Sequence, residues 1–395
     1  MLKQITDLNV TNKRILVRID LNLPRKDGKI SDYTRIERSI KTIKYLLENG
    51  AKVIIISHLG RPKGKYLMEL SLAPIADEIE KYLGKKVKFA SDIFSSNLVT
   101  KTNEMEAGSV MLLENLRFYE GEEKNSAEFV NRLLMLGDLY VNDTFSCSHR
   151  KHASIYGIAE KIPSAAGFLL IDELVNIERI LSDPKKPVLA IIGGSKISTK
   201  LQLLKTLVTK MDYLVIAGAM ANSFLYAQNI HIGNSLHEAS LVSEALEILK
   251  LAKISQCKII LPIDFITSEN LVMHADSKIV SSSEKFTGGI YDIGPKTLNL
   301  IGELIKKSAT IIWNGPVGAF EIEPFDISTR QIARLIASAT KYENKISIAG
   351  GGDTLAAIKS SGLLSSFSYI STGGGAFLEW LEGRDLPGIS ILRYG

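Results

Sequence analysis

Arginine and histidine side chains recur in the first part of the chain, at or just after the ends of predicted strands or at the start of the following helix. Arginine presents a planar fork of N–H donors that suits phosphate and carboxylate oxygens. A scattered, solvated surface is the alternative for any single residue of this kind. Together, at one edge of a domain, they predict a site for a small anionic molecule. The basic group consists of Arg18, Arg35, His58, Arg61, Arg117, His149, Arg150 and His152.

Two polar residues, Asp20 and Asn22, lie beside the first of these arginines in the sequence. Their oxygens can accept hydrogen bonds from ligand hydroxyls, or they can orient neighbouring arginine side chains. Both roles fit an anion site, and the sequence leaves the choice between them open.

Glycine-rich segments dominate the second half of the chain, and we expect each to follow a strand and open a helix. Glycine lets backbone N–H groups approach an anion, and a helix start adds a favourable dipole. A tight turn can explain any one such segment, but four in one domain predict a nucleotide site. None has the spacing G-x-G-x-x-G or G-x-x-x-x-G-K-[ST], so dinucleotide and P-loop sites are disfavoured. The segments are 193–196, 315–318, 350–354 and 373–375.

Three charged residues in or close to these segments could act on a nucleotide. Asp353 ends a glycine run, so we expect it to cap the next helix and, in addition, to bind Mg²⁺ together with phosphate oxygens. Lys196 and Lys200 are four residues apart and would share a helix face if a helix began at Ser198. The two lysines then either form a solvated helix face or act as a pair of cations directed at the phosphoryl group during its transfer.

Several other chemistries lack their sequence signals. The chain has no His/Cys cluster with zinc spacing and no G-x-S-x-G nucleophile motif. Its two cysteines, Cys147 and Cys257, cannot form a disulfide framework and fit a reducing compartment. Nothing in the sequence marks an activating base for Cys147, which makes it a poor candidate nucleophile.

The elements that must position these residues are short apolar strands alternating with amphipathic helices. The apolar segments are rich in Ile and Val and barely alternate in polarity, which is typical of strands buried on both faces of a parallel sheet. Ile36, Ile40, Ile43 and Leu47 mark the face of one helix, and 235–253 repeats the pattern. The predicted strands lie at about 14–20, 52–57, 110–113, 139–142, 187–192, 213–216, 258–261, 310–313 and 345–348.

The fold class that follows is α/β, with two doubly wound, parallel-sheet (Rossmann-like) domains joined by a helical hinge. We place the first domain at 1–165, the interdomain helix at 166–186, within an apolar pattern running from Ile162 to Pro187, and the second domain at 187–383. Ligands of such sheets bind at the carboxyl ends of the strands, so each domain is expected to carry its own site.

Length and composition agree with this organisation. The 395 residues are 45% hydrophobic and 23% charged, which is ordinary for a globular protein of two domains. A net charge of +5 is too small to indicate nucleic-acid binding by itself. The beginning of the chain lacks a signal-like apolar core, and no apolar segment is long enough to cross a bilayer. We therefore expect a cytoplasmic protein without a membrane segment, acting on small molecules as a monomer.

The chain also resembles a known family, the phosphoglycerate kinases. The likeness runs nearly from end to end, in strings such as Val17-Arg18-Ile19-Asp20-Leu21-Asn22 and Trp313-Asn314-Gly315-Pro316-Val317-Gly318. Many such strings in one order make the resemblance highly specific. Further matching segments are 58–62, 113–118, 141–143, 149–150, 152–154, 193–196, 261–264, 350–354 and 371–375.

The resemblance implies reversible phosphoryl transfer from 1,3-bisphosphoglycerate to Mg-ADP, with in-line geometry after hinge closure. It implies that the tail 384–395 packs back on the first domain, and that Arg35, Lys196, Gly373 and Gly374 act on the transferring group. It implies that the glycerate ligand is bound by Asp20, Asn22, Arg35, His58, Arg61, Arg117 and Arg150. It also implies a nucleotide site made of Gly194, Ser195, Lys200, Asn314, Glu321, Gly350, Gly351, Gly352, Asp353 and Thr354, with Mg²⁺ at Asp353.

Alternatives stay open beside this interpretation. A catalytically weak relative would keep the fold and bind a nucleotide or another partner without transfer. A nicotinamide dehydrogenase and a nucleic-acid binder are further classes, each lacking its usual sequence signals. The chain departs from the family pattern at Ser195, Thr199, Asn222, Phe377 and Trp380, which bears on nucleotide affinity more than on reaction type.

Overall fold

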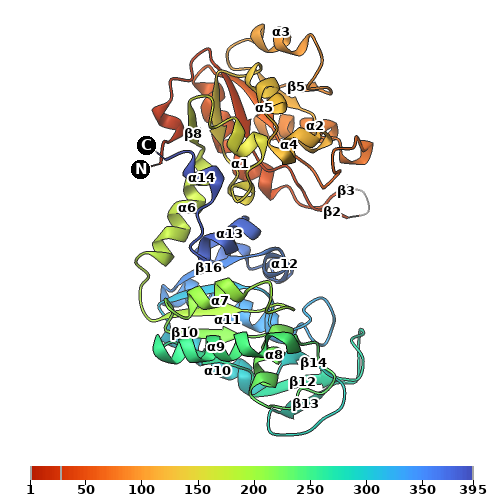
Figure 1. The fold of residues 1–395 in the computed structure, drawn as a ribbon, viewed down its shortest axis with the longest axis vertical. Coiled ribbons are helices and arrows are strands. Elements are labelled where there is room, and N and C mark those ends of the chain that lie inside the picture. The colour runs from red at the N-terminus through yellow and green to blue at the C-terminus, as the bar shows by residue number, and fades with distance from the viewer. Residues whose placement is uncertain (1, 27–28, 394–395) are drawn as a thin grey trace. The chain divides into compact units, whose positions relative to one another are not determined.

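The fold was taken from a computed structural model, which describes residues 2–26 and 29–393. The chain divides into two compact units (Figure 1). The first contains the described residues up to Val175 together with those from Asp385 onward, and the second is Asn176–Arg384. The division falls inside helix α6 (Phe168–Leu181), which therefore contributes residues to both units.

The first unit is built on a six-stranded sheet in which every neighbouring pair of strands is parallel. The chain adds strands on one side of β1 and then returns to add β7 and β8 on its other side. The switch point of the sheet is therefore between β1 and β7, where ligands of open α/β sheets bind. In spatial order the strands are β5 (Val87–Ala90), β6 (Val110–Leu113), β4 (Lys52–Ile56), β1 (Arg14–Arg18), β7 (Leu139–Asn142) and β8 (Ser164–Ala166).

Both faces of this sheet are buried, as the Ile- and Val-rich strands predict. Along β1, Val17 belongs to an apolar cluster with α1 and α2, whereas the neighbouring Leu16 belongs to a second cluster with α3 and α5. A strand that presents apolar side chains to both faces cannot alternate with polar residues. The helical elements of this unit are η1 (Ile5–Asp7), α1 (Thr34–Glu48), η2 (Met68–Leu70), α2 (Ala73–Leu83), α3 (Leu98–Asn103), η3 (Leu116–Phe118), α4 (Glu120–Lys124), α5 (Ala127–Leu134), η4 (Phe145–Cys147), η5 (Ala153–Gly157) and α14 (Pro387–Ser390).

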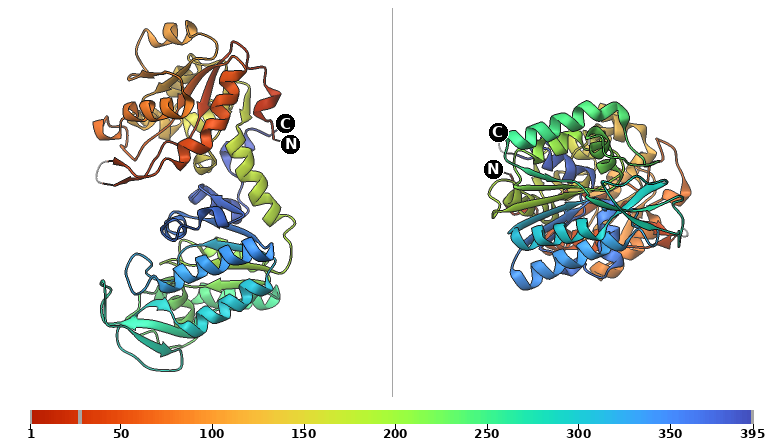
Figure 2. Two further views of the ribbon diagram at one scale, coloured as in Figure 1. Left: turned by 180° about the vertical axis from the view of Figure 1, so that it is seen from behind. Right: turned by 90° about the horizontal axis from the view of Figure 1, so that it is seen from below.

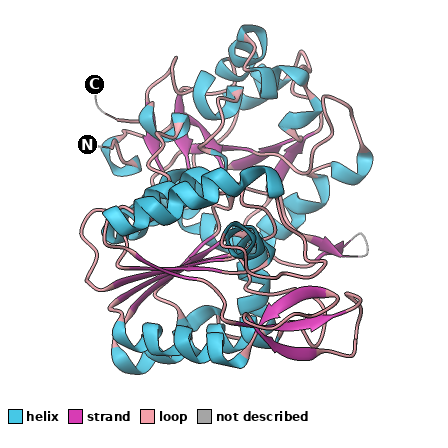
Figure 3. Ribbon diagram, turned by 60° about the horizontal axis from the view of Figure 1, so that its bottom comes forward, coloured by secondary structure: helices cyan, strands magenta, loops and turns pink. Residues whose placement is uncertain are grey.

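The second unit carries another six-stranded parallel sheet, with its switch point between β9 and β15. Helix α9 covers one face, and α10 and α11 cover the other (Figure 2). Figure 3 shows helices on both faces of this sheet. In spatial order the strands are β11 (Lys258–Ile260), β10 (Tyr213–Ile216), β9 (Val188–Ile192), β15 (Thr310–Asn314), β16 (Ile346–Gly350) and β17 (Tyr369–Ser371). Its helical elements are α7 (Leu201–Leu207), α8 (Ala219–Ala227), η6 (Ala239–Leu241), α9 (Val242–Ile254), α10 (Pro295–Lys307), α11 (Ile327–Glu343), α12 (Gly352–Ser360), η7 (Leu364–Ser366) and α13 (Gly375–Leu381).

Two small sheets complete the described secondary structure, and neither was predicted. β2 (Arg25–Lys26) and β3 (Lys29–Ile30) pair antiparallel in the first unit. In the second unit, β13 (Lys278–Ser281), β12 (Asp264–Ser268) and β14 (Gly289–Ile293) form an antiparallel sheet in that order. Each of these strands is short, and their mixed polar composition gave no strand signal.

The predicted α/β fold with two doubly wound parallel sheets is confirmed, but some element boundaries were wrong. The apolar pattern from Ile162 to Pro187 is not one helix, because Ser164–Ala166 forms strand β8 and α6 begins only at Phe168. The helix expected over 235–253 begins at Val242. Small residues such as Ala165 carry little strand propensity, so β8 is determined by its pairing with β7.

Candidate functional site

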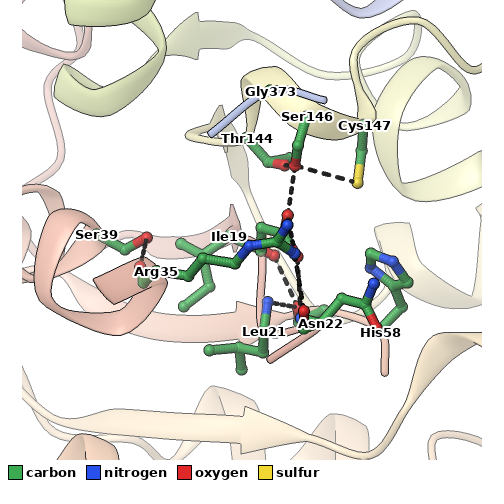
Figure 4. A network of polar contacts seen from close by, with 12 residues as sticks. Ile19, Leu21, Asn22, Arg35, Ser39, His58, Thr144, Ser146, Cys147 and Gly373 are labelled. Carbon is green, nitrogen blue, oxygen red and sulfur yellow. Dashed lines mark hydrogen bonds and ion pairs between the residues drawn. The ribbon is translucent and has the colours of Figure 1, made fainter. Parts of the chain in front are cut away.

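The first unit gathers a polar network at the switch point of its sheet (Figure 4). Arg35, in the first turn of α1, places its NH1 2.8 Å from Asp20 Oδ2 and donates to the Asn22 carbonyl at 2.8 Å. Asp20 also accepts from the Asn22 backbone N–H and from the Ser146 hydroxyl, which approaches from η4 after β7. Asn22 Oδ1 accepts from the Gly60 N–H at 2.8 Å. The loops after β1, β4 and β7 are thus connected through two side chains.

A second, buried set of cations lies at the same edge. Arg18 ends β1 with 1% of its surface exposed, and its NH2 lies 3.0 Å from Nδ1 of His58, which follows β4. Arg117, in η3 after β6, donates from NH1 to the Gly60 carbonyl at 2.7 Å. Its Nε lies 3.4 Å from a Glu123 oxygen, and this buried nitrogen makes no hydrogen bond within the described chain. A buried donor of this kind suits an anionic oxygen of a ligand.

The electrostatics of this edge keep its histidines neutral. Burial, followed by the positive charges of Arg18, Arg117 and Arg35, holds the pKa of His58 well below its ordinary value of 6.5. Burial and nearby arginines also lower the pKa of His149 to about 4 and that of His152 to about 3. The arginines therefore carry the positive charge of the site at neutral pH, and the histidines act as neutral hydrogen-bonding groups.

The other two basic residues predicted for this site are placed differently. Arg150 is half-buried and directs its Nε to His149 Nε2 at 3.2 Å. It is close enough to Arg117 and His152 to lower the pKa of each. Arg61 is exposed, and within residues 2–26 and 29–393 no hydrogen bond or ion pair connects it to the cluster. Its guanidinium is free to reach a ligand from solvent.

In the second unit, Lys200 is the cation at the switch point between β9 and β15. Its Nζ donates to the Gly193 carbonyl and to Asn314 Oδ1, each at 2.6 Å. Asn314 in turn donates to the Gly350 carbonyl at 2.7 Å, which connects the ends of three adjacent strands. Burial lowers the pKa of Lys200 to about 8, and the Asp353 carboxylate acts in the opposite direction. The ammonium keeps one N–H beyond these two bonds.

The glycine-rich segments pack closely at this edge, where the Cβ of a side chain would collide with neighbouring backbone. Their backbone amides can therefore lie at the edge itself. A Cβ on Gly193 would lie 1.9 Å from the Pro316 carbonyl oxygen, so the loops after β9 and β15 pack backbone against backbone. Gly351 has φ +101° and caps α12, whereas a Cβ on Gly352 would meet nothing within 4 Å. Gly374, with φ +52°, caps α13. The N-termini of α12 and α13 thus present open amides suited to phosphate.

The remaining residues predicted for the nucleotide site have these positions. Thr354 is buried, and its hydroxyl accepts the Gly315 N–H at 2.7 Å. Gly373 is buried, and its N–H donates to the Ser371 hydroxyl at 3.1 Å. The exposed members of the set are Ser195, Lys196, Glu321, Gly352 and Asp353, and the half-buried ones are Gly194 and Gly351.

Three local expectations for the second unit were wrong. Asp353 does not cap α12: Gly351 is the cap and Asp353 lies in the first turn. No helix begins at Ser198, because α7 starts at Leu201, so Lys196 is exposed whereas Lys200 points inward. The segment 315–318 follows a strand, but the next helix begins only at Ile327. Close backbone packing around Gly193 sets these loops, and a local sequence pattern does not show it.

Two polar residues of the first unit were missed by the sequence analysis. Ser146 completes the Asp20 network, and its only sequence signal is its position four residues after the end of β7. Glu122 lies fully buried beneath the cations, although it belongs to an acidic run that resembles a solvated helix face. No pattern in the sequence distinguishes it from its exposed neighbours.

The residues that depart from the family pattern differ in how deeply they are buried. Ser195 and Thr199 are exposed. Asn222 is buried and donates to the Leu236 carbonyl at 3.0 Å. Phe377 is fully buried against Gly350, where any Cβ would meet its ring, and Trp380 is half-buried.

The groups at these two edges are suited to binding anions. The first edge offers arginine forks and neutral histidines, and the second offers helix N-termini with a buried lysine. Within the described residues, no group of three or more His, Cys, Asp or Glu side chains could hold a metal ion unaided. No helix in the described ranges is long and apolar enough to cross a membrane.

Comparison with known proteins identifies one family over the whole chain. Residues 5–384 match the family model described as phosphoglycerate kinase. The chain is 53% identical to the phosphoglycerate kinase of Orientia tsutsugamushi (strain Ikeda) over 396 residues, covering 99% of this chain and 97% of that protein. It is 46% identical to the phosphoglycerate kinase of Rhizobium meliloti, covering 99% and 98% respectively.

Solved structures of the same family share the fold. The phosphoglycerate kinase from Coxiella burnetii matches with a TM-score of 0.89 at 42% identity, covering 99% of both chains. The enzyme from Pyrococcus horikoshii OT3 matches with a TM-score of 0.85 at 31% identity, covering 99% of this chain and 98% of the other.

Proposed function

This chain belongs to the phosphoglycerate kinase family, and from that premise we propose which of its residues perform the reaction. The protein is a phosphotransferase with a carboxyl group as acceptor. It moves a phosphoryl group reversibly between 1,3-bisphosphoglycerate and ADP, giving 3-phosphoglycerate and ATP. In this proposal each unit binds one substrate at the switch point of its own sheet.

The first unit binds the phosphoglycerate ligand. The observation that carries this assignment is the convergence of Arg35, His58 and Arg117 at one strand edge, where the buried Nε of Arg117 makes no hydrogen bond within the described chain. Arginine forks match the carboxylate and phosphate groups of such a ligand. The full set proposed for this ligand is Asp20, Asn22, Arg35, His58, Arg61, Arg117 and Arg150.

The second unit binds the nucleotide. Lys200 supplies a charge that is held by Gly193 and Asn314, and the open N-terminus of α12 supplies amides for phosphate oxygens. Glu321 is exposed, seven residues after the end of β15, and is proposed to bind the ribose. The remaining members of the proposed nucleotide set are Gly194, Ser195, Gly350, Gly351, Gly352, Asp353 and Thr354.

Mg²⁺ fits this second site through a single carboxylate. Asp353 is exposed in the first turn of α12, and its charge already acts on Lys200. Magnesium is usually held by one or two carboxylates, with phosphate oxygens and water completing its shell. When bound, the ion neutralises charge on the nucleotide phosphates. A second protein carboxylate is not required.

The transfer step needs alignment and charge stabilisation. A carboxylate oxygen and a phosphate oxygen exchange the phosphoryl group, so no proton has to move and no general base is needed. Catalysis then depends on holding the two oxygens in line and on stabilising the equatorial oxygens. We assign that stabilisation to Arg35 and Lys196, with backbone N–H groups at Gly374 and Gly373. The Gly373 N–H donates to the Ser371 hydroxyl in this structure and would have to exchange that partner for the phosphoryl oxygen.

Single-step transfer also requires the two substrates to meet. We therefore infer that residues 166–186 form a hinge between domains 1–165 and 187–383, and that binding of both substrates brings the domains together. Exclusion of water then prevents hydrolysis of the activated phosphoryl group. Small-angle scattering should show a smaller radius of gyration with both substrates present, and an unchanged radius would contradict closure.

The compartment, the oligomeric state and the partners of the enzyme are also proposed here. We propose that the enzyme works as a cytoplasmic monomer on small molecules, without a membrane or nucleic-acid partner. Its two free cysteines suit a reducing compartment, and its net charge of +5 is small for a chain of 395 residues. Light scattering during gel filtration tests the monomer directly.

The deciding experiment is turnover of 3-phosphoglycerate and Mg-ATP in the back reaction, followed by a coupled assay. The native chain should turn over, and Lys196→Ala should lose most of its turnover while still binding ATP. Lys250→Ala removes a similarly exposed lysine from α9 and is the matched control, which should keep native turnover. If the native chain binds both substrates without turnover, it is a binding relative and the proposal fails.

A further inference from the structure

Arg18 is the most deeply buried arginine of the substrate edge, and its donors are already used by the protein itself. Nε donates to Ser154 Oγ at 2.9 Å and NH1 donates to the Ile19 carbonyl at 2.5 Å. NH2 contacts His58 Nδ1 at 3.0 Å, and Cys147 Sγ lies 3.9 Å from the same nitrogen. NH1 also donates to Ser57 Oγ at 3.4 Å, so no N–H of Arg18 is free, and with 1% of its surface exposed Arg18 has no open path to a ligand.

The contact with His58 fixes the protonation of the imidazole. Arginine has only donors and stays charged, so His58 Nδ1 must accept. A ring nitrogen that accepts carries no proton, so the proton of the neutral ring is on Nε2. Within residues 2–26 and 29–393, Nε2 makes no hydrogen bond. His58 therefore keeps one N–H donor for a ligand.

Arg18 is itself held by a buried carboxylate. The Ser154 hydroxyl that accepts from Arg18 donates to Glu122 Oε1 at 2.6 Å, and the Ser154 backbone N–H donates to Glu122 Oε2 at 3.0 Å. Glu122, Ser154 and Arg18 are all essentially inaccessible to solvent. The chain Glu122–Ser154–Arg18–His58 thus runs from α4 and η5, through β1, to the second residue after β4.

We propose that Arg18 is a positioning residue that holds His58 as the neutral tautomer with its proton on Nε2, and that Glu122 orients Arg18 through Ser154. His58 then donates a hydrogen bond to an anionic oxygen of the phosphoglycerate ligand without adding charge. This role goes beyond the anion-binding function of the site, and it rests on the proposed function only for the identity of the ligand.

The charges around the imidazole support a fixed tautomer. The groups that face His58 are Arg18, Arg117, Arg35 and His152, and all of them lower its pKa, with burial the largest cause. Glu122 is separated from the ring by Ser154 and Arg18, and burial raises its own pKa. His58 should consequently stay neutral across the range of about pH 5 to 8 in which histidine ordinarily titrates.

The first test is nitrogen NMR of the native, ligand-free protein labelled at histidine. His58→Gln assigns the His58 signals among those of the six histidines. We expect a pyridine-type Nδ1 and a pyrrole-type Nε2, both unchanged between about pH 5 and pH 8. A pyrrole-type Nδ1, or titration within that range, overturns the proposal. This result does not depend on turnover, so it is independent of whether the proposed function is correct.

The second test removes the donor arrangement. Arg18→Lys keeps a positive charge, but one ammonium group cannot reproduce the fork that joins Ser154, Ile19 and His58. We expect mixed tautomer signals, a KM for 3-phosphoglycerate raised roughly 2- to 10-fold and an unchanged KM for ATP. Ser154→Ala should give the same effects more weakly, and it serves if Arg18→Lys does not fold.

The matched control is Ser308→Ala, which removes an equally buried hydroxyl from the second unit, where it donates to the Leu304 carbonyl. It should leave the His58 signals and both KM values unchanged. If a folded Arg18→Lys or Ser154→Ala variant keeps the native His58 spectrum, the positioning role is wrong. A raised KM with native His58 signals would likewise overturn it, because Arg18 would then act on the ligand directly.

Discussion

Nucleotide binding should take up a proton above neutral pH, because Lys200 is partly neutral in the free protein. Burial lowers the pKa of Lys200 to about 8, against an ordinary value near 10.4. An anionic phosphate beside Nζ favours the charged form, so the pKa rises when ADP binds. At pH 8.5 about three quarters of the free protein has a neutral Lys200, so binding should take up roughly 0.7 proton per ADP.

The same equilibrium sets the pH dependence of affinity. If only the charged lysine binds phosphate, ADP binding weakens as the pH rises, because the ammonium loses its proton. ADP affinity should then fall roughly 30-fold between pH 7 and pH 9.5. The terminal phosphate of ADP, with a pKa near 6, is already fully ionised in this range. Its own titration therefore adds no slope.

Titration calorimetry in buffers of different ionisation enthalpy measures both quantities. Lys200→Arg keeps its charge at every pH and should show neither proton uptake nor the fall in affinity. Lys250→Ala, with an exposed lysine removed, should behave as the native protein. A native affinity that is constant from pH 7 to 9.5, or an unchanged pH dependence in Lys200→Arg, would refute the assignment of this proton to Lys200.

Further predictions test other parts of the structure. Arg35→Ala should lower turnover by a larger factor than it lowers ADP affinity, and kinetics together with calorimetry would contradict its role if both fell equally. Gly351→Ala should destabilise the second unit in thermal unfolding, because of its φ of +101° and a Cβ contact at 2.6 Å. Gly352→Ala should unfold like the native protein but bind ADP less tightly, and equal stability losses in both variants would count against this distinction. Burial raises the pKa of Asp143 to about 7. Between about pH 4 and pH 7 the folded protein therefore keeps this proton, whereas the unfolded chain has lost it. Stability should fall by up to roughly 4 kcal/mol between pH 4 and 7 from this group, and Asp143→Asn should remove that part of the fall in denaturant unfolding.

The sequence predicted the architecture because burial leaves a local pattern. Strands such as Val188–Ile192 are apolar on both faces, and only a sheet covered by helices on both sides buries them. Polar residues at the ends of such strands then predict the edge at which ligands bind. β8 and the β12–β14 sheet were missed, because their residues carry no comparable pattern and their strands form by pairing.

The sequence predicted the types of residue at the two candidate sites, but it did not predict what each individual residue contacts. Arg18, at a strand end, and Arg35, at the start of the following helix, are both candidate anion-binding arginines in the sequence, yet Arg18 is used internally by Ser154 and His58 whereas Arg35 stays partly exposed beside Asp20. Which arginine faces solvent depends on the direction of each side chain from its own element. That direction is fixed by packing with residues far away in the chain.

The sequence alone thus determined the two parallel sheets, the edge of each at which polar residues gather and the types of those residues, because these follow from periodicity and from the position of strand ends. Only the tertiary structure decided that Lys200 points inward while Lys196 stays exposed, and that Glu122 reaches Arg18 through Ser154. Those arrangements join residues more than a hundred positions apart, such as Arg18 and Ser154. Their geometry depends on strand register and on close backbone packing, which no local pattern of residues encodes.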